Sequence, residues 1–151
     1  MNHWKIKNGW LANFSYHLCH HFLVINRIRK LIILEKHKIV IPFPPSVNHY
    51  WYHAKHRHFI TAKGRAYREA VIAEIRNKKL CKHLSKRLSV EIEVYPPDRR
   101  KRDIDNLMKA PIDALCHGGL IVDDSQIDIL RIERKEILKG GKLVITVWEL
   151  E

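Results

Sequence analysis

The sequence predicts a small single domain of the α/β (α+β) class, with a mixed β-sheet of about four to five strands and two main helices. Three observations support this prediction. Apolar and polar residues alternate in short stretches, most clearly at residues 89–95. Apolar residues recur at roughly helical spacing in two longer stretches, 62–80 and 105–117. The length of 151 residues is sufficient for one hydrophobic core.

The first 37 residues differ in character from the rest, so we expect an N-terminal extension over 1–37 and a domain over 38–151. The extension contains HLCHH (17–21), which lacks the paired ligand spacing of zinc sites and is better interpreted as a surface segment. The stretch FLVINRIRKLIIL fits either an amphipathic helix with a basic face or an extra strand. The extension as a whole is either an addition to the folded domain or no part of it.

The sequence of the first half of the domain predicts one strand, one irregular segment and one helix. KIVIPFPP is a short strand that the prolines end. SVNHYWYHAKHRHF is polar and aromatic, and we predict a loop or irregular ribbon there. Thr61 is a candidate N-cap for the helix that follows. The predicted apolar face of that helix consists of Ala66, Tyr67, Ala70, Val71, Ala73 and Ile75.

The sequence of the second half predicts further strands and one helix. SVEIEVY is a half-buried strand that Pro96 and Pro97 end. NLMKAPIDALCHGG is a helix closed by two glycines, and Pro111 predicts a kink or a late start because it lacks an N–H. LIV (120–122) is a short strand. Residues 127–137 and 142–149 are predicted to form a hairpin around Gly140-Gly141.

Charge and cysteine content narrow the possible functions. Lys and Arg outnumber Asp and Glu by 28 to 16, a net charge of +12, which favours polyanionic partners and nucleic acid above all. The three cysteines are distant from one another and form no CxxC pair, which suits a reducing cytoplasm. The most apolar stretch, near residues 22–34, is interrupted by three basic residues, so we expect no membrane span.

The segment DRRKRDIDNLMK (98–109) places carboxylates directly after a basic run. Asp103 and Asp105 are two residues apart, so both side chains point the same way in an extended backbone. The following helix leads away from them, and the short strand after the glycines returns by a similar distance. We therefore expect Asp123 and Asp124 to lie beside the first pair, with one of the two on the same face.

Several carboxylates at one place favour a bound Mg²⁺, with Mn²⁺ as a possible substitute. Such an ion activates water and stabilises charge on a phosphodiester. Lys109, four residues after Asp105, either donates to a phosphate oxygen or pairs with Asp105. The basic residues Arg99, Arg100, Lys101 and Arg102 are candidates for phosphate contacts.

Two alternatives remain open from the residues alone. In a nucleic-acid-binding module without catalysis, the same carboxylates are helix caps and surface salt bridges. An enzyme acting on nucleotides through DxD and Mg²⁺ is less favoured, because no GxxxxGK[ST] loop is present.

Several blocks together resemble the RusA family of Holliday junction resolvases, which phages and prophages often carry. The resemblance covers about residues 38–151. The blocks occur in family order: PFPPSVNHYW, ITAKGRAYREAV, PPDRRKRDIDNLMKAPIDAL, GLIVDDSQI and KGGKLVITVWE.

The resemblance implies a RusA-like dimer that resolves four-way DNA junctions in recombination and repair, by paired symmetric nicks that depend on magnesium. It implies metal binding by Asp103, Asp105 and Asp124, with Asp123 as the adjoining acid. Lys109 matches the lysine of the family's active-site helix. DNA contacts are expected from the basic run and also from Asn48, Lys63, Arg65 and Arg68.

Two features depart from the family pattern. Residues 1–37 have no counterpart in the short members of the family. The loop after Asn48 is rich in histidine, which we interpret as DNA-facing or solvated rather than metal-binding. Because a prophage copy can decay while keeping its fold, a non-catalytic DNA-binding protein remains the alternative.

Overall fold

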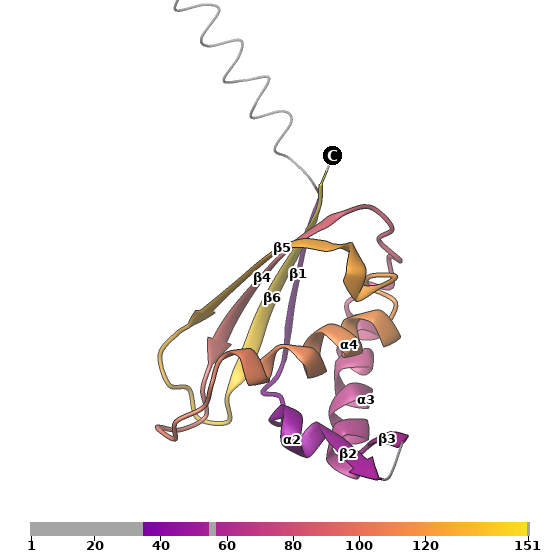
Figure 1. Cartoon of the computed structure of the whole chain (residues 1–151). Coiled ribbons are helices and arrows are strands. Elements are labelled where there is room, and N and C mark those ends of the chain that lie inside the picture. Colours follow the sequence, from indigo (N-terminus) through magenta and orange to yellow (C-terminus); the bar gives the residue numbers. More distant parts are fainter. Residues whose placement is uncertain (1–34, 55–56, 151) are drawn as a thin grey trace, which may run out of the picture. The chain divides into compact units, whose positions relative to one another are not determined.

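The computed structural model describes residues 35–54 and 57–150 (Figure 1). The architecture below is that of the unit Glu35–Glu151. The HLCHH and FLVINRIRKLIIL segments lie outside the described residues, so their interpretations stay predictions. The first strand begins at Lys36, two residues before the predicted start of the domain.

A four-stranded mixed sheet forms one layer of the domain. Its strand order is β1 (Lys36–Pro42), β6 (Lys142–Glu149), β4 (Leu88–Tyr95), β5 (Ile127–Arg134). The β4–β5 pair is parallel, whereas β1–β6 and β4–β6 are antiparallel. A separate two-stranded sheet pairs β2 (Trp51–Ala54) with β3 (Arg57–Ile60). The predicted α+β class with a mixed sheet is confirmed.

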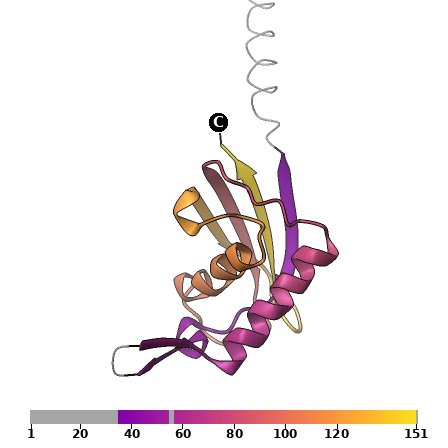
Figure 2. The ribbon, with the colours of Figure 1, turned by 90° about the vertical axis from the view of Figure 1, so that its right-hand side faces the viewer.

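Two helices, α3 (Ala62–Asn77) and α4 (Lys109–His117), lie on the same side of the sheet, and Figures 1 and 2 show this from two directions. The core lies between these layers. Every second residue of β4 is buried, which is the alternation that predicted this strand. The fully buried side chains of the core include Ile39, Ile41, Val71, Ile75, Leu88, Ile92, Leu115, Leu143 and Ile145.

Thr61 caps α3 as predicted. Its Oγ1 accepts a hydrogen bond from the Gly64 N–H at 3.0 Å and donates to the His49 carbonyl at 2.6 Å. The buried face of α3 is narrower than predicted: Tyr67, Val71 and Ile75 are buried, at spacing of four, whereas the predicted alanines are exposed. Small side chains satisfy the helical pattern without reaching the core.

The segment predicted to be a loop or irregular ribbon contains a short helix, α2 (Val47–Tyr50), followed by the two-stranded β2–β3 ribbon. Tyr50 explains the difference, because its side chain is only 1% exposed. Its ring makes edge-on contacts with Trp51 and Tyr67, at centroid distances of 5.4 and 6.5 Å. Packing against α3, which the local sequence pattern does not show, therefore orders this segment.

The helix containing Pro111 starts late, as expected. Residues Asp105–Leu107 form a 3₁₀ turn, η1, and α4 begins only at Lys109. Pro111 then falls in the first turn of α4, where a backbone N–H has no intrahelical partner to lose. Asp105 does not cap α4, since the N-cap position is Met108 and no side chain bonds there.

The predicted C-terminal hairpin is wrong, because β4 lies between β5 and β6 in the sheet. Gly140 and Gly141 both have positive φ, 89° and 63°, so they do form a tight turn. The glycine pair indicates a reversal of the chain but does not specify which strand pairs with which. The predicted strand at 120–122 is reduced to a single parallel bridge between Leu84 and Ile121.

No helix in the described part of the chain is long and apolar enough to cross a membrane.

Candidate active site and basic loop

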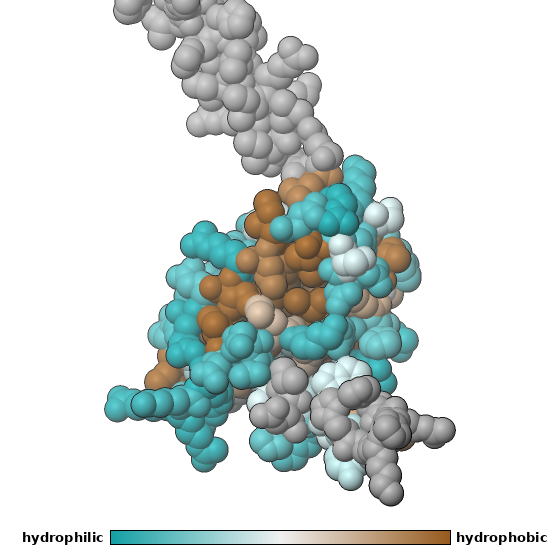
Figure 3. All heavy atoms as spheres, viewed as in Figure 1, coloured by the Kyte–Doolittle hydropathy of each residue, from teal (hydrophilic) through white to brown (hydrophobic). Residues whose placement is uncertain are grey.

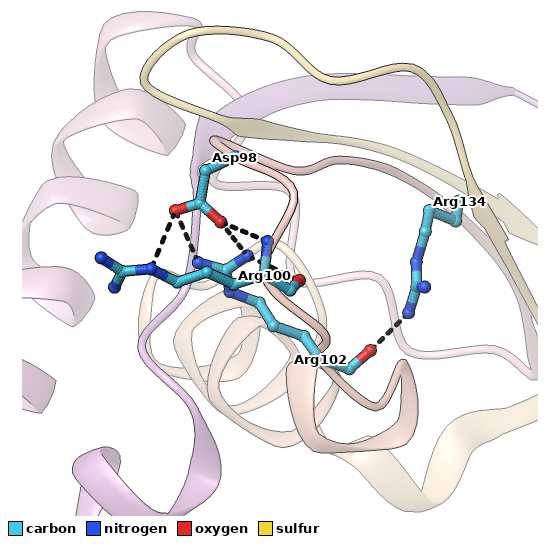
Figure 4. Close-up of polar contacts among 4 residues, drawn as sticks. All are labelled: Asp98, Arg100, Arg102 and Arg134. Atoms are coloured by element: carbon cyan, nitrogen blue, oxygen red, sulfur yellow. Dashed lines mark hydrogen bonds and ion pairs between the residues drawn. The ribbon is translucent and has the colours of Figure 1, made fainter.

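The basic loop, residues 98–102, follows β4 and is organised by the carboxylate of Asp98 (Figure 4). Asp98 Oδ1 accepts the backbone N–H of Arg100 at 2.9 Å. The Arg102 guanidinium donates to both Asp98 oxygens, at 2.7 and 2.9 Å. These hydrogen bonds, from Arg102 first and then from the Arg100 backbone, lower the pKa of Asp98 to about 2. Asp98 therefore remains ionised at neutral pH and holds the loop in one conformation.

Arg102 packs and hydrogen-bonds within the domain, unlike the other basic residues of the loop. Its side chain is 25% exposed, and the guanidinium lies 5.5 Å from the centroid of the Phe43 ring. From β5, Arg134 donates a hydrogen bond to the Arg102 carbonyl, as Figure 4 shows. Arg102 thus connects the loop to two other segments of the domain.

The other three basic residues of the run, Arg99, Arg100 and Lys101, are exposed. The Arg100 side chain, 84% exposed, reaches the Asp98 carboxylate only at 3.9 Å. The sequence treats the four basic residues alike, whereas the structure separates three solvent-facing cations from one that is paired within the fold.

Two cavities connect the basic loop to the predicted acidic residues. One, of about 480 Å³, lies between the proline segment 43–46 and the loop, and Asp103 and Asn106 line it. Another, of about 580 Å³, is lined by Lys101, Arg102, Asp103, Ile104, Asp105 and Arg134. Asp103 and Asp105 therefore line a common cavity beside cationic side chains. The backbone between them is not extended as predicted, because Ile104 is in the αR region and Asp105 begins η1.

Asp105 is exposed, and its Oδ1 accepts the N–H of Asn106 at 2.9 Å. This local bond fixes the carboxylate at the start of η1. The structure does not pair Lys109 with Asp105, which was one of the two predicted roles of the lysine.

Lys109 instead joins two other carboxylates at the start of α4. Its Nζ lies 2.7 Å from Asp124 Oδ2 and 2.9 Å from Asp113 Oδ1. The hydrogen bond with Asp124, followed by that with Asp113, raises the pKa of Lys109, and desolvation opposes this only in part. The ammonium is therefore charged throughout the physiological range. Asp124 returns to the start of α4, but the predicted cluster with Asp103 and Asp105 is not formed among the described residues.

Asp123 has a separate role at the same turn. Its Oδ1 accepts the Ser125 N–H at 2.9 Å, while Gln126 Oε1 accepts the Asp123 N–H at 2.7 Å. This capping box begins the 3₁₀ turn η2 (Asp124–Gln126) and lowers the pKa of Asp123 through its bonds with Ser125. The structure thus shows Asp124, rather than Asp123, as the carboxylate that faces Lys109.

The predicted metal ligands fit a hard divalent cation in their chemistry, since all supply carboxylate oxygens. Their arrangement in the described structure is not that of a metal site. Among residues 35–54 and 57–150, no three side chains of Asp, Glu, His or Cys lie close enough together to hold an ion. The Lys109 ammonium already neutralises Asp124, and a cation that uses this carboxylate has to compete with it.

The remaining predicted DNA contacts lie on α2 and α3. Asn48 is part of α2. Lys63 and Arg65 are exposed in the first turn of α3, and Arg65 Nη1 donates to the Ile60 carbonyl at 2.9 Å. Arg68 is half-buried and near Tyr50, whose pKa its charge lowers against the larger effect of burial.

Sequence reasoning missed Asp113, although the signal was visible. Asp113 follows Lys109 by four residues, a spacing that places two side chains on one helix face. The negative field around it also reaches Cys116. Burial, followed by the charges of Asp124, Asp113 and Asp123, raises the pKa of the Cys116 thiol to about 11.

Comparison with known proteins agrees with this architecture. The family model described as endodeoxyribonuclease RusA matches residues 42–148. A crossover junction endodeoxyribonuclease RusA from Shigella sonnei (strain Ss046) is 40% identical over 117 residues, covering 78% of this chain and 98% of the relative. The proteins of that name from Escherichia coli (strain K12) and Enterobacteria phage 82 are each 39% identical over 117 residues, with the same coverage.

The match includes the basic loop, the DxD segment, α4 and the acidic turn at η2, and it spans most of the folded unit. The resemblance predicted from separate sequence blocks is confirmed. The chain belongs to the RusA family of endodeoxyribonucleases.

Proposed function

We propose that this chain is a divalent-metal-dependent endonuclease that resolves four-way DNA junctions by paired symmetric nicks, in recombination and repair. The observation that supports it best is the cavity that Asp103 and Asp105 share with the cationic loop, followed along the chain by the Lys109–Asp124 pair. The relatives are named for this activity on crossover junctions.

Each part of the site has a separable task. Arg99, Arg100 and Lys101 attract and position the phosphate backbone, because they are exposed cations. Asp103, Asp105 and Asp124 would hold the cation, Mg²⁺ or in its place Mn²⁺. When bound, that ion supplies an activated water and a counter-charge for the phosphodiester.

The Lys109 ammonium contacts two carboxylates at the start of α4, those of Asp113 and Asp124. Its charge is secure, because the pKa of Lys109 is raised. We assign it the task of donating a hydrogen bond to a phosphate oxygen on which negative charge develops.

A homodimer is part of the proposal, because two symmetric cuts in a two-fold junction need two sites. Figure 3 shows apolar side chains gathered on the viewed face of the domain. The exposed apolar residues include Val122, Ile129 and Leu130, two of them on the edge strand β5. Such an edge is a surface on which a second copy can pair. A chain that sediments as a monomer at micromolar concentration would contradict this part.

The deciding experiment compares a synthetic four-way junction with a linear duplex of the same sequence. The full chain is incubated with each substrate in Mg²⁺, Mn²⁺ or EDTA. We expect paired nicks in the junction alone, abolished by EDTA. Equal cutting of the duplex, or cutting in EDTA, would contradict the proposal.

The second candidate is a junction-binding protein without catalysis. The Lys109–Asp124 pair and the Asp123 cap favour it, because both use the acidic residues structurally. It predicts tight, salt-sensitive binding that is indifferent to metal. Metal-dependent turnover in the assay above would exclude it.

A further inference from the structure

The Lys109 ammonium is held by two carboxylates that differ in exposure and in origin. The side chain of Asp113 is 15% exposed, whereas that of Asp124 is 43% exposed. Asp113 lies on the same helix as Lys109, while Asp124 belongs to the separate turn η2. Contact with Asp113 therefore persists whenever α4 is intact, and contact with Asp124 requires that η2 also keep its place.

Asp113 is anchored within the packing of the helices. Tyr50 of α2 is fully buried, and after burial itself the charge of Asp113 is the largest cause of its raised pKa. The Asp113 carboxylate is therefore within electrostatic range of Tyr50, and it contacts the Lys109 ammonium directly at 2.9 Å. A carboxylate so placed is a fixed partner, since it has little freedom to move into solvent.

The two contacts have different consequences for the proposed metal ligands. Asp124 is one of the three expected ligands, and Asp113 is not. An ammonium and a divalent cation on one carboxylate repel each other, so they compete for Asp124. Without another anion nearby, Lys109 would lose its only partner when the cation binds, and it would oppose that binding.

We propose that Asp113 is a positioning residue for Lys109: it keeps the ammonium at the start of α4 when Asp124 is released to a divalent cation. This inference rests on the proposed nuclease function. In the described structure Lys109 bridges both carboxylates. When Asp124 holds a cation, Asp113 alone would retain the ammonium, and Nζ would remain at the start of α4 without occupying the Asp124 carboxylate.

The simplest competing interpretation is an ordinary helix-surface ion pair with four-residue spacing. That interpretation assigns Asp113 an effect on stability only. It predicts that replacing Asp113 changes neither the affinity for the cation through Lys109 nor the rate of cutting at saturating junction.

The test is a double-mutant cycle on the full chain, with Mn²⁺ as the probe and no DNA. Mn²⁺ affinity is measured by isothermal titration calorimetry for wild type, Asp113→Asn, Lys109→Met and the double variant. A direct charge effect of Asp113 on the ion lowers affinity equally in both backgrounds, whereas an effect through Lys109 disappears with the lysine.

We expect Asp113→Asn to weaken Mn²⁺ binding about tenfold in wild type and less than about twofold in the Lys109→Met background, a coupling typical of residues in contact. Equal losses in both backgrounds, or no Mn²⁺ binding by the wild-type chain, would overturn the inference. The matched control is Glu133→Gln, since Lys135 is likewise shared by Glu133 at 2.7 Å and Glu93 at 3.6 Å. We expect that control to bind Mn²⁺ as wild type does.

Junction cleavage provides the second readout. Asp113→Asn should lower kcat by roughly tenfold to a hundredfold while KM for the junction stays within about twofold, because the variant misplaces one group without removing a group that binds DNA. Asp113→Glu should recover part of the rate. Changes confined to KM would overturn the positioning role.

If Asp113→Asn does not fold, a measurement on the wild-type chain tests the positioning role of Asp113 instead. The Nζ resonance of Lys109, identified by its loss in Lys109→Met, is followed by ¹⁵N NMR during a Mg²⁺ titration. A resonance that stays hydrogen-bonded at saturation supports retention by Asp113, and one that disappears into exchange with water overturns it.

These results separate the inference from the proposed function. A wild-type chain that cuts junctions but shows no coupling between Asp113 and Lys109 would leave the nuclease proposal intact. Coupling without any cutting would support the positioning role and contradict the nuclease function.

Discussion

The basic loop and the start of α4 each contain an ion-pair cluster, and the two clusters have opposite ratios of cations to carboxylates. In the loop, one carboxylate, Asp98, is shared by an arginine and a backbone N–H. At α4, one cation, Lys109, is shared by two carboxylates. In the first arrangement, both oxygens of the Asp98 carboxylate accept hydrogen bonds, and these bonds hold the backbone of the loop in place. The second leaves net negative charge, which a further cation can neutralise.

The difference shows how a chain of net charge +12 keeps a region of net negative charge at α4. The loop directs its one bound arginine inward and its remaining basic side chains to solvent. The acidic residues lie beyond it, with a single lysine among them. Under the proposed function, attraction of DNA and attraction of metal are therefore assigned to neighbouring but separate segments.

The largest expected effect comes from the acidic side of this comparison. Asp105→Asn should reduce junction cleavage on the order of 10³-fold while the protein still binds the junction, because the change removes a proposed metal ligand and leaves the cations of the basic loop in place. Single-turnover cleavage and gel-shift affinity on one preparation check both parts. A variant that cuts as fast as wild type would remove Asp105 from the site.

The next effect tests whether the four basic residues of the run are equivalent. Arg99→Ala, Arg100→Ala and Lys101→Ala should each weaken junction binding and reduce the slope of log K against log salt by about 0.9 for each phosphate that the variant no longer neutralises. Salt titrations by fluorescence anisotropy provide the slopes. Unchanged slopes in all three variants would mean that the exposed cations do not bind DNA.

A smaller effect distinguishes Arg102 from those three. If Arg102 acts by holding the loop, Asp98→Ala should weaken junction binding too, although it removes a negative charge. The double variant Asp98→Ala/Arg102→Ala should then be no weaker than Arg102→Ala alone. Tighter binding by Asp98→Ala would show that Arg102 acts as a free cation.

The pH dependence of the loop follows from the lowered pKa of Asp98. A carboxylate whose folded pKa is about 2, below its ordinary 3.8, stabilises the fold above the ordinary value. That contribution is lost as the pH falls through the folded pKa. The Arg102 Nη–H resonances should therefore persist at about pH 3.5 and disappear near pH 2, whereas loss above about pH 4 would contradict the pairing.

The smallest effect reports on the acidic side without any substrate. With its pKa near 11, only about one thousandth of Cys116 is thiolate at pH 8, so iodoacetamide should modify it far more slowly than the exposed Cys81. Peptide mapping by mass spectrometry separates the two rates. Asp124→Asn should accelerate modification of Cys116 slightly, since burial remains the main cause of the shift.

Much of this protein could be predicted from local patterns. Alternation specified β4, Thr61 specified the start of α3, and Pro111 specified the late start of α4. These features depend on neighbouring residues in the chain, and steric and hydrogen-bonding rules over a few residues are sufficient for them. The family blocks and the acidic candidates were likewise visible as short segments.

The errors share one physical cause, which is dependence on contacts distant in sequence. The Gly140-Gly141 turn suggested a β5–β6 hairpin, but β4 lies between those strands because the central β6 pairs with both β1 and β4. The helix α2 forms because Tyr50 is buried against α3, whereas the segment alone has the composition of a loop.

The sequence by itself determined the α+β class, the family, the basic run and the acidic residues near α4. Only the tertiary structure decided their partners: Arg102 with Asp98 and Phe43, and Lys109 with Asp113 and Asp124. The physical reason is that residue type fixes charge and hydrogen-bonding capacity, whereas pairing depends on which segments the packed core brings within about 3 Å of each other.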